Sequence, residues 1–197
     1  VPEVFPLGET VVTLTATDSQ GNTATETLTV TISDQTNPTV AATDLSVEAT
    51  EAGGASVTLA TLLSQVTASD NVDVEPAVSL DAEEGVFGFG DTVVNVTVTD
   101  AASNSATASF TVSVADTTAP AFEGLVNLVL TVEEEQPVAS SDERFVAWLD
   151  GITAVDVVDG DVAYTTSEIP EEFPVGVTTL TFTTSDSRGN ENEESVT

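Results

Sequence analysis

Apolar and polar residues alternate in several short runs along the chain. From Val94 to Thr99 every second residue is valine, and the residues between them are Asn or Thr. A period of two with β-branched residues is typical of a strand that buries one face. Asn95, Thr97 and Thr99 should then face outward. The residues expected to face inward in this and the similar runs are Val12, Leu14, Leu28, Val30, Ile32, Val94, Val96, Val98, Phe110, Val112, Val114, Leu180 and Phe182.

Two short segments suggest helices. They cover residues 59–66 and 142–149, where apolar residues recur at helical spacing. In the second segment Ser141 is the expected N-cap, ahead of Asp142. Trp148 lies on the apolar face of this segment, so we expect it in the core rather than on a sugar-binding surface. The rest of the chain is predicted to be strand and turn.

The chain contains an internal repeat. The segment FPLGETVVTLTATDSQGN, which begins at Phe5, recurs as FGFGDTVVNVTVTDAASN from Phe87 and as FPVGVTTLTFTTSDSRGN from Phe173. The upstream segments LLSQVTASDNVD and WLDGITAVDVVD also align. The copies lie 82 and 86 residues apart, which is too long for a solenoid turn and is about the length of an immunoglobulin-like sandwich. We therefore predict all-β, tandem immunoglobulin-like β-sandwich domains, with one short helix per repeat.

Two proline-containing linkers mark the expected boundaries, which are DQTNP from Asp34 and DTTAP from Asp116. They predict a partial repeat over residues 1–36, a complete middle repeat over residues 37–118, and a third repeat over residues 119–197. The first part holds only a final hairpin, which is marginal in water without further sequence or a neighbouring molecule. The third repeat is expected to lack its last strand.

Composition then excludes several classes of function. The chain has 34 acidic residues against two basic ones, Arg144 and Arg188, and its net charge is -32. Nucleic acids and anionic membranes are recognised through Lys and Arg, so we exclude both as partners. Cys, His and Lys are absent, which removes thiol, imidazole and Schiff-base catalysis. Carboxylate pairs with a spacing that demands glycosidase chemistry are not found, so we predict that the protein is not an enzyme.

The pattern F-P-x-G-x-T-x-V-x-x-x-A-x-D-x-x-G-N-x-A, followed by T-V-x-V-x-D-x-x-x-P, resembles hyalin (HYR) repeats and related bacterial immunoglobulin-like domains. The stretch from Ala154 to Asp161 is similar to the aspartate-rich loop of the same group. The resemblance covers essentially the whole chain and implies a secreted, extracellular or cell-surface setting. Such repeats occur in adhesins, stalks and enzyme appendages, so the resemblance leaves the ligand open.

Chain topology is expected to gather acidic segments at each linker. In a sandwich the last hairpin turn lies at the end where the domain's chain enters. The turn that begins at Asp100 should therefore face the linker at Asp34, and the loop from Asp70 should end at the same place. The next linker repeats this arrangement. The candidate metal ligands are Asp34, Asp70, Asp73 and Asp100 at the first junction, and Asp116, Asp156, Asp159, Asp161 and Asp186 at the second.

Clustered carboxylates repel one another unless a cation lies among them. Ca²⁺ takes roughly six to eight oxygen ligands from carboxylates, Asn and backbone carbonyls. The arrangement is similar to cadherin linkers, which bind calcium between domains, so we expect structural Ca²⁺ at both junctions. The alternative is that these aspartates only cap turns by accepting hydrogen bonds from turn amides. For Asp18, which has no linker before it, we expect capping alone.

The leading hypothesis is a spacer or adhesin segment of a bacterial surface or secreted protein, rigidified by calcium at its domain junctions. Its partners would be the neighbouring repeats of the same chain, while other domains would bind a surface glycan or protein. The alternative is an accessory, glycan-binding module of a secreted polysaccharide-active enzyme, which would require an exposed strip of aromatic residues. A third explanation is salt adaptation without a specific ion.

Overall fold

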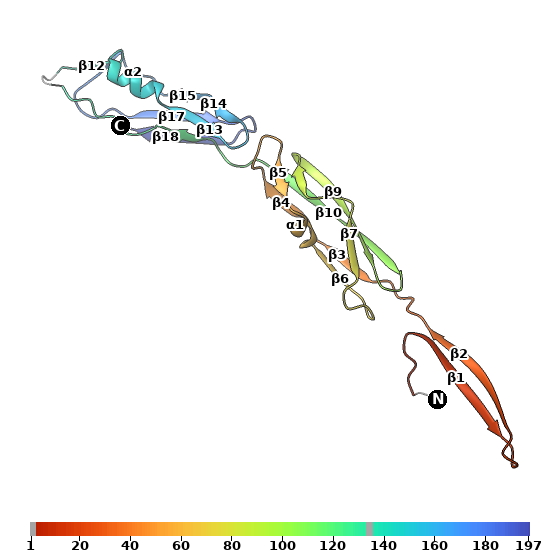
Figure 1. Cartoon of the computed structure of the whole chain (residues 1–197). Coiled ribbons are helices and arrows are strands. Elements are labelled where there is room, and N and C mark those ends of the chain that lie inside the picture. Colours follow the sequence, from red (N-terminus) through yellow and green to blue (C-terminus); the bar gives the residue numbers. More distant parts are fainter. Residues whose placement is uncertain (1–2, 133–135) are drawn as a thin grey trace. The chain divides into compact units, whose positions relative to one another are not determined.

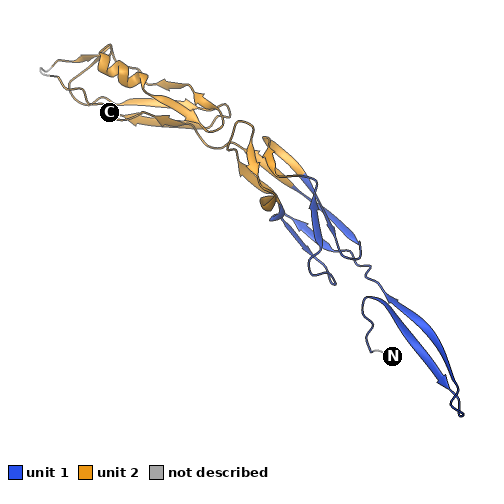
Figure 2. Cartoon of the chain, viewed as in Figure 1, with its two compact units in different colours: residues 1–43, 63–82, 94–110 blue, residues 44–62, 83–93, 111–197 orange. Residues whose placement is uncertain are grey.

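The computed structural model describes residues 3–132 and 136–197, and within them it contains eighteen strands and two short helices (Figure 1). The predicted all-β, immunoglobulin-like fold class is confirmed. Contacts within the chain define two compact units, which are coloured separately in Figure 2. The boundary between these units runs through the middle repeat, and each unit is described by itself. The repeat boundaries proposed from the linkers stay predictions.

The first unit comprises residues 1–43, 63–82 and 94–110. Its strands pair antiparallel, β1 with β2, β3 with β6, and β7 with β9. Strands β9 and β10 continue from this unit into the second. The strands are β1 (Gly8–Thr17), β2 (Thr23–Ile32), β3 (Thr39–Ala42), β6 (Val66–Ser69) and β7 (Ala77–Leu80), with parts of β9 (Gly90–Thr99) and β10 (Ser105–Ala115).

The second unit comprises residues 44–62, 83–93 and 111–197. Its helices are most of α1 (Leu59–Leu63) and all of α2 (Glu143–Asp150). Its strands are β4 (Leu45–Glu48), β5 (Ala55–Val57), β8 (Gly85–Phe87), β11 (Ala121–Glu123), β12 (Val138–Ala139), β13 (Thr153–Asp156), β14 (Gly160–Val162), β15 (Tyr164–Thr166), β16 (Glu172–Phe173), β17 (Leu180–Ser185) and β18 (Glu191–Val196).

The alternation in the middle repeat predicts its burial correctly. Val94, Val96 and Val98 in β9 have no exposed surface, whereas Asn95 and Thr97 are exposed and Thr99 is half-buried. On β10, the three residues that were expected to face inward, Phe110, Val112 and Val114, are also buried. These strands belong to a four-stranded sheet with the order β4-β10-β9-β7, in which β4 and β10 are parallel.

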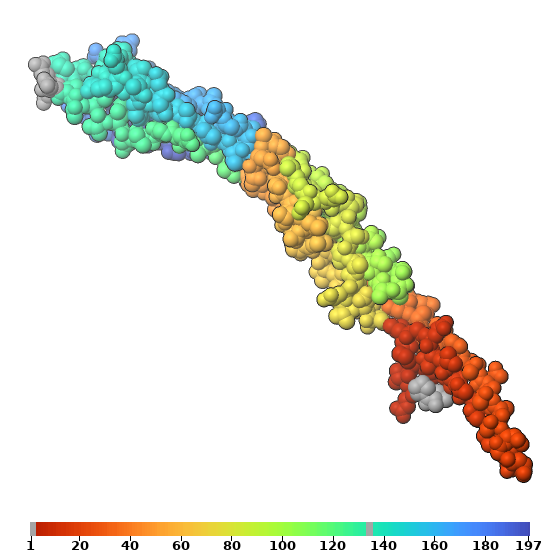
Figure 3. All heavy atoms as spheres, viewed as in Figure 1, coloured from red at the N-terminus to blue at the C-terminus, as the bar shows by residue number. Residues whose placement is uncertain are grey.

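The hairpin β1–β2 has the predicted strands but not the predicted burial. Val12 is paired with Leu28 across the hairpin, yet Leu14 and Leu28 are 53% and 55% exposed. In the space-filling view of Figure 3 this hairpin is coloured red to orange. The expectation that these residues are buried is therefore wrong for this segment, because an apolar face is buried only where another layer packs on it.

The third repeat is a sandwich with an aromatic core. One sheet has the order β11-β13-β14 and the other β15-β17-β18. Phe122 from the first sheet makes edge contacts with Tyr164 and Phe182 from the second, at centroid distances of 6.0 and 6.1 Å. Phe182 is fully buried. The interleaved rings join the two sheets through a hydrophobic core.

Helix α2 packs against this core through its apolar face. Phe145 is buried, and Trp148 packs on the same cluster while its Nε1 donates a 3.0 Å hydrogen bond to the Val126 carbonyl. The expectation that Trp148 lies in the core is confirmed. The N-cap is Asp142, whose carboxylate accepts from the Arg144 amide. Ser141, the cap expected from the sequence, is therefore one residue too early.

Candidate functional site

Two clusters of three aspartates are the most distinctive sites in the described residues. The first contains Asp34, Asp70 and Asp100, and the second contains Asp116, Asp156 and Asp186. In each cluster, one carboxylate oxygen from every residue lies within 4.8 Å of the others. Each cluster combines a linker, a loop and a hairpin turn, as the sequence predicts. Each also lies entirely within one compact unit.

The hairpin turns supply Asp100 and Asp186 through a common clasp. The carboxylate of Asp100 accepts from the Asn104 amide and from Asn104 Nδ2, both at 2.8 Å. Asp186 is held in the same way by Asn190. The side chain of each Asn also reaches its linker, because Nδ2 of Asn104 donates to the Asp34 carbonyl and Nδ2 of Asn190 to the Asp116 carbonyl. The Asn side chains thus tie the turn to the linker.

The aspartate-rich loops supply Asp70 and Asp156. Oδ2 of Asp70 accepts from the amides of Val72 and Asp73, and Oδ1 of Asp156 accepts from the amides two and three residues later. These bonds are Asx-turn caps of the kind considered in the alternative hypothesis. In each residue the capping uses one carboxylate oxygen. The other oxygen, Oδ1 of Asp70 or Oδ2 of Asp156, is buried and has no hydrogen-bond partner.

The linker before the third repeat holds Asp116 in place. Its Oδ1 accepts from the Thr118 amide at 3.3 Å, while its buried Oδ2 has no hydrogen-bond partner. Glu48, at the end of β4, accepts from the amide and hydroxyl of Thr117 and from the hydroxyl of Thr118. These bonds lower the pKa of Glu48, with the Thr117 hydroxyl contributing most. The linker backbone is thus anchored to the middle repeat.

Three of the nine candidate ligands lie outside the three-carboxylate clusters. Oδ2 of Asp73 accepts from the Ala101 amide at 3.0 Å, and Oδ2 of Asp159 accepts from the Ser187 amide at 2.7 Å. Both residues therefore connect the loop to the first amide of the hairpin turn. Asp161 lies in β14, where it pairs with Val155, and is exposed.

The pKa values of Asp116 and Asp186 in the second cluster shift in opposite directions. Burial raises the pKa of Asp116, and the nearby Asp156 and Asp186 raise it further, although the Thr118 amide and Arg188 act in the opposite direction. For Asp186 burial also acts upward, but hydrogen bonds from Asn190 and from the Arg188 and Gly189 amides outweigh it and lower the pKa. The charge of Asp116 is therefore less well compensated than that of Asp186.

The turn at Asp18 provides an internal comparison. Its carboxylate accepts from the amides of Gln20 and Asn22 and from Asn22 Nδ2. These hydrogen bonds lower the pKa of Asp18, with the Asn22 side chain contributing most. Asp18 is exposed and is absent from both clusters. The capping expected for this residue is what the structure contains.

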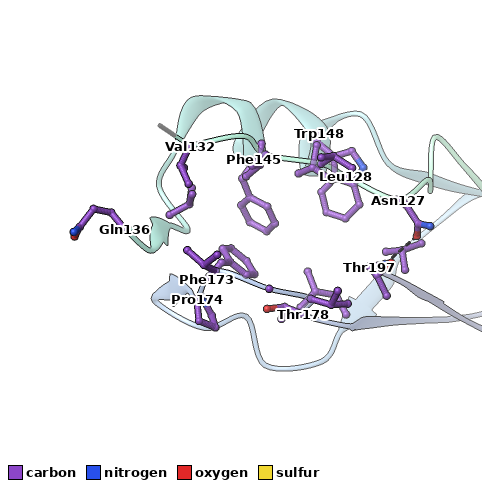
Figure 4. Close-up of a pocket in the computed structure, with 18 residues that line it drawn as sticks. Asn127, Leu128, Val132, Gln136, Phe145, Trp148, Phe173, Pro174, Thr178 and Thr197 are labelled. Carbon is purple, nitrogen blue, oxygen red and sulfur yellow. Dashed lines mark hydrogen bonds between the residues drawn. The ribbon is translucent and has the colours of Figure 1, made fainter. Parts of the chain in front are cut away.

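The third repeat also has an apolar cavity of about 440 Å³, shown in Figure 4. Phe145 and Phe173 face one another within it at a centroid distance of 4.8 Å. At its edge the Thr197 amide donates to Asn127 Oδ1, as the Thr111 amide donates to Asp44 Oδ1 in the middle repeat. Beyond Thr111, β10 continues with buried residues. The cavity therefore adjoins the hydrophobic core of the third repeat, to which Phe145, Leu180 and Val196 of its lining belong.

Sequence reasoning did not identify Glu48 or Arg188 as parts of the second junction. Glu48 lies far from Thr117 in the sequence, and only the parallel pairing of β4 with β10, which sets Glu48 beside Ala115, brings it there. A signal for Arg188 did exist, since it is one of two basic residues and lies in the turn between Asp186 and Asn190. A lone cation among so many carboxylates is expected to lie beside at least one of them in the fold.

Comparisons with known proteins agree with the sequence pattern. Residues 33–114 match the HYR domain family. The chain is 32% identical over 194 residues to hyalin of Lytechinus variegatus and 34% identical over 196 residues to hyalin of Strongylocentrotus purpuratus. These alignments cover 95% and 96% of the chain but 35% and 16% of the two hyalins. The chain thus spans only part of the curated relatives it matches, and the bacterial origin suggested by the sequence stays a prediction.

Among solved structures, the chain aligns with protocadherin gamma B2 extracellular cadherin domains 3–6, at 16% identity and a TM-score of 0.35, over 95% of this chain and 58% of that chain. A second alignment is with PcdhgB3 EC1-4, at 12% identity and a TM-score of 0.34, over 96% and 57% of the two chains. No described helix is both long and apolar enough to cross a membrane. The HYR match and the hyalin alignments support the hyalin-repeat resemblance and an extracellular setting for this chain.

Proposed function

We propose that the chain is a non-catalytic spacer segment of an extracellular adhesive protein, and that Ca²⁺ bound at the two aspartate clusters stiffens its junctions. The observation that carries this proposal is the set of buried carboxylate oxygens without hydrogen-bond partners. They belong to Asp70 in the first cluster and to Asp116 and Asp156 in the second. A buried carboxylate without a compensating partner is costly, and the cost rises when other carboxylates are close.

The donor set suits calcium. Each cluster offers three carboxylates, and the linker carbonyls of Asp34 and Asp116 lie close enough to be bonded by the turn Asn. Calcium prefers such hard oxygen ligands, whereas zinc sites are built mainly from Cys and His, which this chain lacks. Because the capping bonds in Asp70 and Asp156 use one oxygen each, turn capping and ion binding can coexist in the same residue.

The partners and the attachment of the whole protein also belong to this proposal. Neighbouring repeats of the same chain are the partners that the linkers imply, and other domains would bind the glycan or protein target. The accessory, glycan-binding alternative requires exposed aromatic side chains in a row. Trp148 is half-buried and packs against the third-repeat core, and the Arg188 guanidinium stacks on one face of the Phe89 ring. These two residues therefore do not favour that alternative.

The direct test is a calcium titration of the purified chain by calorimetry, with thermal unfolding in calcium and in chelator at matched ionic strength. Two sites with dissociation constants of about 10⁻⁴ to 10⁻³ M are expected for an extracellular module. At a calcium concentration of about 100 times the dissociation constant, each site should stabilise the bound form by about 2.7 kcal/mol. Magnesium at the same concentration is the control for ionic strength and charge screening.

Paired variants separate the two clusters. Asp116→Asn with Asp156→Asn should abolish the second site and leave the first, and Asp34→Asn with Asp70→Asn should do the reverse. Asp18→Asn is the matched control, because it changes the same kind of turn residue where no cluster exists. Small-angle scattering should show a narrower range of maximum particle dimensions in calcium than in chelator. Absence of both calcium heat and a thermal shift in the wild type would leave turn capping as the whole role of the aspartates.

A further inference from the structure

Arg188 occupies a position that the first junction leaves without a cation. Its Nη1 lies 3.7 Å from Oδ2 of Asp116 and 3.7 Å from Oδ1 of Asp159. The guanidinium carbon lies 3.6 Å from the centroid of the Phe89 ring, which belongs to the loop before β9. All these residues lie in the second compact unit. A stacked guanidinium with two carboxylates beside it is a fixed cation rather than a solvated side chain.

The oxygen that Arg188 faces is the one that lacks a hydrogen-bond partner. The side chain of Asp116 has no exposed surface, and its Oδ2 is among the unpartnered buried atoms. At 3.7 Å the guanidinium provides charge without a hydrogen bond. The contact therefore reduces the cost of the buried charge but does not saturate the oxygen's coordination.

The first junction has the same framework without this cation. The repeat alignment places Ala102 where Arg188 lies, in the turn between Asp100 and Asn104, and it places Leu7 where Phe89 lies. Neither the cation nor the aromatic ring for stacking is present there. Asp34 and Asp70 of the first cluster are also only half-buried, whereas every member of the second cluster is buried. The two junctions thus have similar acidic ligands but different built-in charge.

We propose that Arg188, stacked on Phe89, is the resident counter-ion of the second junction. The linker at Asp116 and the turn that holds Arg188 then stay in contact without calcium, which is what closure of the junction means here. The second junction also binds calcium more weakly than it would without the arginine. The first junction, which has no such residue, depends on the metal. This inference rests on the proposed calcium function for its second half only. Closure in the absence of metal is a property of Arg188 itself and can be measured in chelator.

The decisive experiment uses the full 197-residue chain in chelator, with hydrogen exchange followed for residues 116–120 and 34–38. In the wild type, residues 116–120 should exchange several-fold more slowly than residues 34–38. Arg188→Ala should reduce this difference, although the bonds of Glu48 to Thr117 remain, and Phe89→Leu, which copies the first junction, should reduce it less. Arg188→Lys keeps the charge but loses the planar stack, so it should lie between the wild type and Arg188→Ala.

The reciprocal variant places an arginine and an aromatic ring at the corresponding positions of the first junction. Leu7→Phe combined with Ala102→Arg should slow exchange at residues 34–38 in chelator and leave residues 116–120 unchanged. In calcium titrations, Arg188→Ala should tighten the second site on the order of tenfold, because one positive charge beside the ligands is gone. The wild-type affinity of the second site should be correspondingly weaker than its affinity in this variant.

The outcomes separate this inference from the proposed function. If the wild type binds no calcium but Arg188→Ala still accelerates exchange at residues 116–120, the calcium proposal fails and the resident counter-ion stands. If calcium binds but Arg188→Ala changes neither the exchange in chelator nor the affinity of the second site, the inference is overturned. Thermal unfolding followed by Trp148 fluorescence verifies that each variant keeps a folded third repeat.

Discussion

The middle and third repeats share the hydrogen bonds around their aspartate clusters but differ in the residues of their hydrophobic cores. At aligned positions, Val94 and Val96 of the middle repeat correspond to Leu180 and Phe182 of the third, and all four are buried. In the third repeat Phe182 contacts Phe122, Trp148 and Tyr164 through ring edges or tilted faces. The turns and loops around the clusters, by contrast, repeat their hydrogen bonds almost residue by residue. The same turn and loop hydrogen bonds are therefore compatible with either an aliphatic or an aromatic core.

The largest expected effect comes from the third-repeat core. Phe182→Ala should destabilise that repeat by about 3 to 5 kcal/mol, because a fully buried ring at the meeting point of the two sheets is lost. Trp148 fluorescence in denaturant reports on this repeat, since the chain has one Trp. The matched change Val96→Ala should cost about 1.6 kcal/mol in the middle repeat, at about 0.8 kcal/mol per buried methylene. Equal costs would refute the distinction between the two interiors.

The next largest loss of stability is expected when Asn190 or Asn104, which bond the hairpin turn to the linker, is replaced. Asn190→Ala removes the donor to the Asp116 carbonyl and to Asp186, and leaving buried acceptors unpaired should cost about 1 to 3 kcal/mol. Asn104→Ala should behave in the same way at the first junction. Asn22→Ala, in the exposed Asp18 turn, should cost less because water can replace the lost bond. Chemical denaturation of the three variants measures this order, and a cost for Asn22→Ala equal to the others would contradict it.

A smaller effect distinguishes the hairpin turns. Ser103 has a positive φ of 72° where the aligned turn of the third repeat has Gly189 at 89°. Left-handed backbone is costly for residues with a Cβ atom, so Ser103→Gly should stabilise the middle repeat by about 0.5 to 1 kcal/mol. Gly189→Ala should destabilise the third repeat by about 1 to 2 kcal/mol through backbone strain alone, because its Cβ would meet nothing within 4 Å. Melting temperatures that move in the same direction for both changes would contradict this account.

The smallest expected difference is in how the N-caps of the two helices respond to low pH. Arg144 and its amide lower the pKa of Asp142 from 3.8 to about 2, whereas α1 is capped by the neutral hydroxyl of Thr58. A lowered pKa favours the folded state above pH 3.8, and this contribution is lost as the pH falls through about 2. The stability difference between the wild type and Asp142→Asn should therefore shrink between these two pH values. A constant difference across this range would show that the ionised cap contributes nothing.

Local patterns in the sequence predicted much of this protein correctly. The alternation in β9 and β10 predicted which residues are buried, because side chains on a strand point to opposite faces in turn. The repeated turns and linkers predicted that Asp34, Asp70 and Asp100 would meet, since a sandwich brings the entry linker and the last turn to one end. The same reasoning brought together Asp116, Asp156 and Asp186. These results depend on period and connectivity, which the sequence contains directly.

Other features depended on packing across long stretches of chain. The alternation in β1 and β2 could not say whether a second layer covers Leu14 and Leu28. The sequence could not show which carboxylate oxygens are left unpaired, because that depends on which turn amides point toward each one. The contact of Glu48 with the linker follows from the pairing of β4 and β10, and the stacking of Arg188 follows from the position of Phe89. Side-chain partners far apart in sequence are set by tertiary structure, since burial and hydrogen-bond geometry arise only when the layers pack.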